Sequence, residues 1–128
     1  MPGPARAGLF VYAKDCERVS TFYESVAGMT RVHNSDELTV LESPDIQLLV
    51  HKIPDQIADN IVITSPPEKR ENTALKFFFT VPSLAEARKV ASSQGGEIFN
   101  ENWVGPGFVV CNAMDPEGNV FQVRENVV

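Results

Sequence analysis

The sequence contains few of the residues from which metal centres, disulfide frameworks and nucleic-acid surfaces are built. Its 128 residues include only two histidines and two cysteines, and Cys16 and Cys111 stand singly within apolar patterns. Single cysteines without a regular spacing are typical of a reducing compartment, so we expect a cytoplasmic protein. Basic residues are also scarce: 11 lysines and arginines stand against 17 acidic residues, for a net charge of −6 without a basic stripe. Binding to nucleic acid is therefore not expected.

Long apolar runs are missing as well. The N-terminal segment MPGPARAG lacks the apolar stretch of a signal peptide, and no other segment is long enough to cross a membrane. Hydrophobic residues nevertheless make up 43% of the chain, which is enough for a packed core. A chain of 128 residues suits one domain, covering residues 1–128. We therefore expect a soluble acidic protein with no membrane partner.

The order of the predicted elements occurs twice. In the first half, a strand pattern precedes a helix that Asp15 caps and Gly28 ends, and three further strand patterns follow. In the second half, a strand pattern again precedes a helix, which Ser83 caps and Gly95-Gly96 ends, and three strand patterns follow. Asp15 and Gly28 are 13 positions apart, and so are Ser83 and Gly96. Equal spacing and equal order predict two copies of one βαβββ module.

These two modules define the predicted fold. We expect an α+β fold of two tandem βαβββ modules, the first at about residues 7–53 and the second at about residues 74–126. The linker between them, at about residues 54–73, is polar and interrupted by proline, as a surface crossing requires. The second module begins with a predicted strand at residues 75–81. A loop is predicted at residues 101–107, where glycine and proline limit regular structure.

Strand alternation gives each predicted sheet two different faces. One face is apolar and can pack under the helices. The other mixes aromatic, aliphatic and polar side chains, so it is either the solvated side of an antiparallel sheet or the wall of a ligand pocket between curved sheets. Aromatic rings on this face favour the pocket. With Trp103 from the predicted loop, the candidate pocket residues are Phe10, Tyr12, Gln47, Leu49, His51, Lys76, Phe78, Trp103, Gln122 and Arg124.

The polar candidates have two interpretations each. Lys76 and Arg124 either bind an anionic group of a ligand or extend to solvent from a sheet edge. His51 either acts as a general base or polar contact, or lies at a strand end without a chemical role. Trp103 either closes over a ligand or packs against a partner subunit. No phosphate loop, serine triad or CxxC motif is present, so the sequence assigns no catalytic residue.

Two segments carry a family resemblance. The order βαβββ–βαβββ, the segment YAKDCERVSTFYESVAGM and the closing DPEGNVFQV resemble the vicinal oxygen chelate superfamily. That superfamily contains glyoxalase I, extradiol dioxygenases, fosfomycin-resistance enzymes and bleomycin-resistance proteins. The resemblance covers nearly the whole chain and implies curved sheets that enclose a cavity. It also implies a homodimer, often one in which modules are exchanged.

The resemblance does not extend to a metal centre. Metal-dependent members carry ligands on four strands, and the matching positions here are Gly8, Leu49, Lys76 and Gln122. Of these four side chains only that of Gln122 offers an oxygen donor, and a protonated lysine has no lone pair. Because catalytic divalent sites use about three protein ligands, we predict neither a metal nor another cofactor.

Two kinds of function stay open at this point. The first is a protein that binds a small molecule in a metal-free cavity, as the bleomycin-resistance type does. The second is a metal-dependent lyase, isomerase or dioxygenase with an atypical ligand set that includes His51, Gln47 and Gln122. The missing donors favour the first function.

Overall fold

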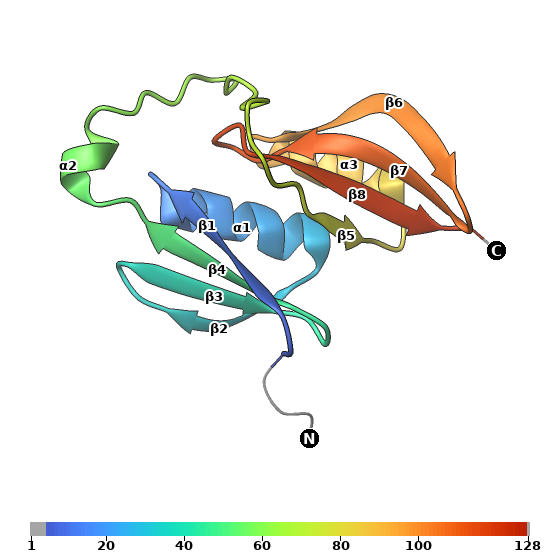
Figure 1. Cartoon of the computed structure of the whole chain (residues 1–128), viewed down its shortest axis with the longest axis horizontal. Helices are drawn as coiled ribbons and strands as arrows, with labels where there is room; N and C mark the ends of the chain where they lie inside the picture. Colours follow the sequence, from blue (N-terminus) through green and yellow to red (C-terminus); the bar gives the residue numbers. More distant parts are fainter. Residues whose placement is uncertain (1–4, 128) are drawn as a thin grey trace.

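Two four-stranded mixed sheets form the fold, and two long helices pack against them (Figure 1). The computed structural model describes residues 5–127. Along the chain the elements are β1 (Gly8–Ala13), α1 (Cys16–Ala27), β2 (Thr30–Asn34), β3 (Leu38–Glu42), β4 (Gln47–Lys52), α2 (Asp55–Ala58), β5 (Phe78–Thr80), α3 (Leu84–Ser93), β6 (Glu97–Gly105), β7 (Phe108–Met114) and β8 (Val120–Asn126). The strand order is β1-β4-β3-β2 in one sheet and β5-β8-β7-β6 in the other.

The two sheets are built by the same pairing scheme. β1 pairs in parallel with β4, and β5 pairs in parallel with β8, whereas the other neighbours are antiparallel. Phe10 lies beside Leu49 in the first sheet, and Phe78 lies beside Gln122 in the second. These pairs occupy equivalent positions in the two modules. The predicted α+β fold of two tandem βαβββ modules is therefore confirmed.

Both long helices begin where the sequence predicts. Asp15 caps α1 by accepting a backbone N–H of the first turn at 3.1 Å, and Ser83 caps α3 in the same way at 3.2 Å. Gly28 ends α1 in the left-handed conformation, with φ 66°. Gly95-Gly96 ends α3 as predicted: the helix stops at Ser93, and Gly95, with φ 90°, turns the chain.

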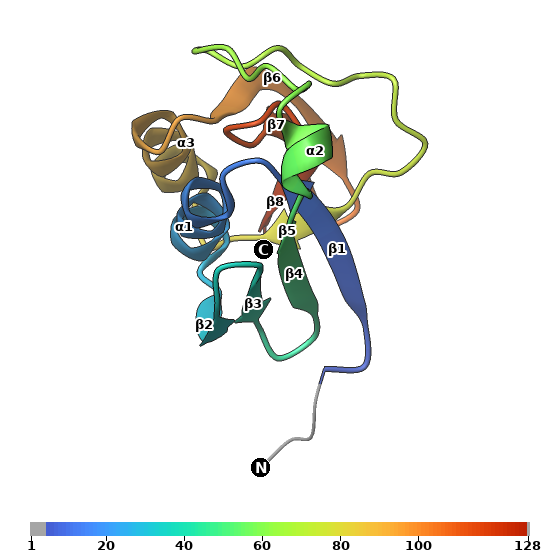
Figure 2. The same cartoon turned by 90° about the vertical axis from the view of Figure 1, so that its left-hand side faces the viewer.

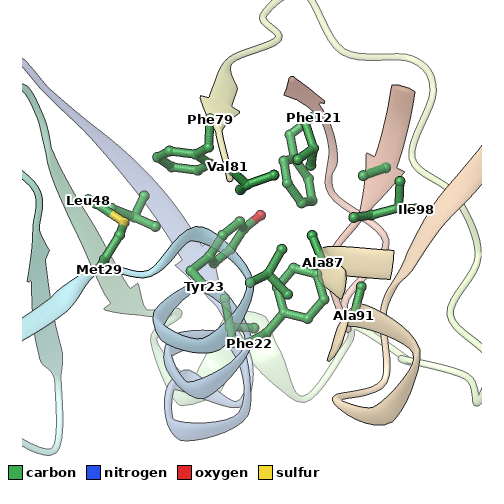
Figure 3. Packing of buried hydrophobic residues seen from close by; sticks show 14 of the residues in the cluster. Phe22, Tyr23, Met29, Leu48, Phe79, Val81, Ala87, Ala91, Ile98 and Phe121 are labelled. Carbon is green, nitrogen blue, oxygen red and sulfur yellow. The ribbon is translucent and has the colours of Figure 1, made fainter. Parts of the chain in front are cut away.

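One aromatic core joins the two modules. α1 and α3 lie side by side along the sheets (Figure 2). From α1, the buried Phe22 and Tyr23 reach Phe121 of β8, with ring centroids 5.9 and 5.3 Å away (Figure 3). Tyr23 also lies 6.0 Å from Phe79 of β5. Because each such aromatic pair contributes about 0.5–1.5 kcal/mol beyond surface burial, the helix of the first module stabilises the sheet of the second.

A buried turn makes a second connection between the modules. Residues 115–118 join β7 to β8 in a tight turn, in which the N–H of Gly118 donates to the carbonyl oxygen of Asp115 at 2.9 Å. The carboxylate of Glu117 accepts the backbone N–H groups of Lys14 at 2.8 Å and Asp15 at 2.7 Å. These two N–H groups belong to the connection from β1 to α1. The turn of the second module thus holds the start of the first module's helix.

The strand predicted at residues 75–81 is shorter in the structure. β5 spans only Phe78–Thr80, and the side chain of Leu75 is 86% exposed instead of packing under a helix. β5 has one neighbour, β8, and the backbone contact nearest its start joins the N–H of Gln122 to the carbonyl oxygen of Phe77 at 2.9 Å. Within residues 5–127, the ladder with β8 pairs residues only from Phe78 onwards, so Leu75 to Phe77 are not part of the strand.

The loop predicted at residues 101–107 is mostly strand. β6 continues through Gly105, and Trp103 pairs with Val110 of β7. Only two residues are left for the turn into β7, and Gly107 adopts φ 80° there. The glycines and proline mark a tight hairpin turn rather than a long loop.

No helix between residues 5 and 127 is long and apolar enough to span a membrane. The first four residues of MPGPARAG lie outside the described residues.

Candidate functional site

Module one presents an aromatic cluster on the sheet face that points away from α1. Phe10 and Tyr12 stack with ring centroids 6.1 Å apart, and Tyr12 lies 5.6 Å from the ring of His51. The side chains of Phe10 and Tyr12 are 54% and 56% exposed. The other two predicted residues of this face are already in contact with neighbours: Leu49 pairs with Phe10, and the Gln47 amide donates to a β3 carboxylate at 2.9 Å.

Module two carries a polar row on the equivalent face. The side-chain oxygen Oδ1 of Asn112 on β7 accepts hydrogen bonds from Gln122 Nε2 at 3.2 Å and from Lys76 Nζ at 3.5 Å. Gln122 and Lys76 are predicted site residues, whereas Asn112 was not singled out. The signal was present in the sequence, because alternation along GFVVCNA puts Asn112 opposite to the core residues Cys111 and Ala113.

A stacked arginine lies next to this row. The guanidinium carbon of Arg124 is 3.7 Å from the ring centroid of Phe78 on β5 and 4.2 Å from that of Phe108 on β7. β8 runs between β5 and β7, so the two rings approach Arg124 from opposite sides. Phe108 is a second contributor to this face that was not singled out, although it alternates in register with Asn112.

A cleft of about 450 Å³ opens at the polar row. This volume lies within the range of about 300–1,000 Å³ that is usual for small-molecule sites. Lys76, Asn112 and Trp103 line the cleft, and Trp103 is 44% exposed. Residues of the linker line it too, and the ammonium of Lys69 lies 4.7 Å from the centre of the Phe99 ring.

The two modules do not share this cleft within one chain. The lining residues come from module two and from the linker, and none of the five predicted residues of module one is among them. A second hollow of about 620 Å³ lies between the modules and is lined by Lys76 and Phe78, together with Met29 and Ile46. Lys76 therefore borders both spaces. The assignment of all ten predicted residues to one pocket stays a prediction.

The side chains at the four family ligand positions do not fit a divalent metal ion. A Cβ placed on Gly8 would lie 3.7 Å from a methyl of Leu49, so these two positions do face each other, but neither provides a donor. On module two, Lys76 brings an ammonium beside Gln122, where a cation would be repelled. Within residues 5–127, no three or more histidine, cysteine, aspartate or glutamate side chains form a group that could hold a metal ion. In the alternative set, Gln47 and His51 lie on β4 and Gln122 lies on β8, and the amides of both glutamines already donate to Glu42 and Asn112.

The free thiol of Cys16 does not suit nucleophilic chemistry. Cys16 lines a polar hollow at the start of α1. Burial raises the pKa of the Cys16 thiol, and the carboxylates of Glu117 and Asp15 raise it further. A thiol with a raised pKa is mostly protonated at neutral pH and is therefore a weak nucleophile.

The comparison with known families agrees with the resemblance found in the sequence. A family model described as a glyoxalase-like domain matches residues 8–124. No curated protein matches the chain. A glyoxalase/bleomycin resistance protein/dioxygenase family enzyme from Burkholderia phytofirmans PsJN superposes with a TM-score of 0.68 at 15% identity, covering 97% of this chain and 100% of the other.

Two further solved structures have the same fold. The lactoylglutathione lyase from Agrobacterium tumefaciens has a TM-score of 0.60 at 20% identity, over 98% of this chain and 96% of its own. A genomically encoded fosfomycin resistance protein from Listeria monocytogenes has a TM-score of 0.63 at 14% identity, over 100% and 96%. Likeness at these identities concerns the fold and not the activity. Together with the family match over residues 8–124, it shows that the chain belongs to the glyoxalase-like domains of the vicinal oxygen chelate superfamily.

Proposed function

We propose that this protein binds a small organic molecule without a metal ion. The ligand occupies the exposed face of the β5–β8–β7–β6 sheet, at the cleft that Lys76, Asn112 and Trp103 line. The main support is the combination of a cleft of about 450 Å³ with a polar row in place of metal ligands. At three of the four positions that carry metal ligands in the family, the side chain here has no atom that could bind a metal ion. Any recognition there therefore depends on hydrogen bonds, charge and stacking.

We further propose that two copies of the chain enclose the ligand as a homodimer. Four aromatic side chains of the predicted pocket are about half exposed in the single chain, from 44% for Trp103 to 56% for Tyr12. Phe10 and Tyr12 are also stacked on each other, so they form a continuous apolar patch on a sheet face. Such patches are typical of association surfaces. A second copy that covers them would bring a module-one face opposite a module-two face.

The absence of a metal is tested by metal analysis of protein purified without chelator, followed by calorimetric titration with Ni²⁺ and Mn²⁺. We expect no stoichiometric binding of either ion. Stoichiometric binding that is lost in Gln122→Ala or His51→Ala would contradict the proposal. It would support the alternative of a metal-dependent lyase, isomerase or dioxygenase.

Ligand binding is tested by a thermal-shift screen of small organic acids and amphipathic aromatic compounds. We expect at least one class of compound to raise the Tm of the wild type. Trp103→Ala should remove most of that increase, because the indole lines the cleft. Val104→Ala is the matched control: its side chain is 78% exposed, and alternation places it on the other face of β6. Equal loss of the shift in both variants would contradict the placement of the ligand.

The oligomeric state is measured by light scattering, where we expect twice the chain mass of 14.1 kDa. Phe10→Asp should shift the protein towards the monomer, because it places a charge in the aromatic patch. Val32→Asp is the control, since Val32 is also 54% exposed but lies on β2, at the opposite edge of the sheet from β1. A monomeric wild type would rule out the homodimer.

A further inference from the structure

The Arg124 side chain is held in one orientation before any ligand binds. Its guanidinium lies between the rings of Phe78 and Phe108, at 3.7 and 4.2 Å from their centroids. The three residues come from the adjacent strands β5, β8 and β7 (Figure 1). Two flanking rings and the burial of Nε leave the Nη end of the guanidinium as the part that can meet a ligand.

Gly105 is the residue that makes this arrangement possible. It pairs with Phe108 across the β6–β7 hairpin. A Cβ at position 105 would overlap the ring atoms of Phe108, so any larger residue would push the ring away from its present place. The absence of a side chain at position 105 thus lets Phe108 fold over the strand and reach Arg124. This is a close approach that only glycine permits.

Arg124 has donors without acceptors. Its Nε atom is buried and has no hydrogen-bond partner among residues 5–127. The ion pairs in that part of the chain use other basic residues, and neither Arg124 nor Lys76 takes part in one. The neighbouring carboxylate of Glu125 is directed elsewhere, because it accepts the N–H of Leu84 at 2.7 Å. The Nη1 and Nη2 groups are not among the buried atoms and have no acceptor within residues 5–127 either, so they can donate to a ligand group that brings two oxygens.

The surroundings of Arg124 define the rest of the ligand. Gln122 is two residues away on the same strand, at a distance of about 7 Å along the sheet, and belongs to the polar row with Lys76. The chain as a whole has a net charge of −6, yet this face presents two basic side chains. The acidic residues that line the cleft are Glu71, which is paired with Lys69 at 3.1 Å, and Glu101, which lies on β6 two residues from Trp103.

We propose that Arg124 anchors a carboxylate, and that the ligand of this protein is therefore a small organic acid with an apolar or aromatic body. The carboxylate accepts two hydrogen bonds from the guanidinium edge. The body extends over Phe78 towards the amides of Gln122 and Asn112. This inference depends on the proposed binding function and specifies the chemical class of its ligand. No covalent step is involved.

The test compares phenylacetate with the neutral phenylacetamide on the full chain. Fragments of this size bind weakly, so both are used up to about 10 mM. Binding is measured by thermal shift and by ¹⁵N NMR of the arginine Nε–Hε signals, which needs no variant. We expect phenylacetate to move the Arg124 signal and to bind at least about tenfold more tightly than the amide, because charge-assisted bidentate bonds are lost in the amide. Inorganic phosphate at the same concentration serves as a second anion and should move the signal less.

Four variants locate the effect. Arg124→Gln should weaken phenylacetate at least about tenfold, and Arg124→Lys should restore only part of it, because an ammonium lacks the guanidinium fork. Lys89→Gln is the matched control for charge, and no loss of phenylacetate binding is expected, because Lys89 lies exposed on α3 and does not line the cleft. Gly105→Ala keeps the charge but displaces Phe108, so it should also weaken phenylacetate. Circular dichroism and Tm establish that each variant is folded.

The outcomes separate this inference from the proposed function. Equal binding of acid and amide, an unchanged Arg124 signal, or a full response in Arg124→Gln would each overturn the carboxylate anchor. If the neutral compounds of the screen still bind in a Trp103-dependent way, the proposed binding function stands without the anchor. A response of Lys89→Gln as large as that of Arg124→Gln would mean that anions are attracted by charge in general and not by a specific anchor, and would also overturn the inference.

Discussion

The hydroxyl of Tyr23 donates a hydrogen bond of 2.8 Å to the Asp115 carboxylate, and both side chains are buried. Tyr23 belongs to α1 of the first module, and Asp115 begins the turn that leads into β8 of the second. Burial raises the pKa of Asp115, although hydrogen bonds from Asn119, Tyr23 and the backbone N–H of Glu117 oppose this change. Burial also raises the pKa of Tyr23, and the Asp115 charge adds to it. The pair thus connects the two modules through a neutral donor and a desolvated acceptor.

Tyr23→Phe should lower the free energy of unfolding. The ring still fills the core, but Asp115 loses one of its donors in a buried place, which costs about 1–3 kcal/mol. Urea denaturation measures the change. Tyr12→Phe is the control, because the Tyr12 side chain is 56% exposed and its hydroxyl has water as an alternative partner. Equal effects of both variants would contradict a special role for the Tyr23–Asp115 bond.

The stability that depends on Asp115 should decrease as the pH rises. The folded-state pKa of Asp115 is raised, so the folded state holds the proton more tightly than the unfolded chain does. This contribution is fully present below the ordinary aspartate pKa of about 3.9 and is lost as the pH rises through the folded-state pKa. Urea unfolding of the wild type and of Asp115→Asn measures this contribution between about pH 3.5 and about pH 7, a range that begins near the ordinary aspartate pKa. The free-energy difference, wild type minus variant, should be largest at the acidic end. A difference that grows with pH would show that the folded-state pKa is lowered instead.

Glu117→Gln should weaken the connection between the turn and the start of α1. The wild-type carboxylate accepts the N–H groups of Lys14 and Asp15 at 2.8 and 2.7 Å, whereas an amide has only one acceptor oxygen. One N–H is then left unsatisfied, and we expect a loss of about 1–3 kcal/mol in the free energy of unfolding. Glu97→Gln, at the exposed start of β6, should change it little. Hydrogen exchange at Lys14 and Asp15 should become faster in Glu117→Gln alone.

Phe121→Ala should destabilise both modules together. Phe121 is fully buried and lies 5.9 Å from Phe22 and 5.3 Å from Tyr23, across the boundary between modules. Removal of a buried phenylalanine side chain costs about 3–5 kcal/mol. Because the core is shared, calorimetry should record one unfolding transition at a lower Tm. Two separate transitions would mean that each module folds on its own core. Val32→Ala, at an exposed valine of β2, serves as the control.

The sequence by itself determined the order of the elements, the starts of the two long helices and the two faces of each strand. Asp15, Ser83 and Gly28 act on backbone groups a few residues away, so their effect can be read locally. Alternation is local too, and it placed Gln122 and Arg124 on one face. The residue types alone also show that Gly8 and Leu49 have no side-chain atom that could bind a metal ion.

Only the tertiary structure decided which side chains meet. Asn112 bridges Lys76 and Gln122, and Phe108 stacks on Arg124, because the register of β7 against β8 brings them together across the sheet. The short β5 and the long β6 follow from the same cause: a segment becomes a strand where a neighbour provides a hydrogen-bonded ladder. Register depends on contacts between residues far apart in the chain, and no local pattern specifies them.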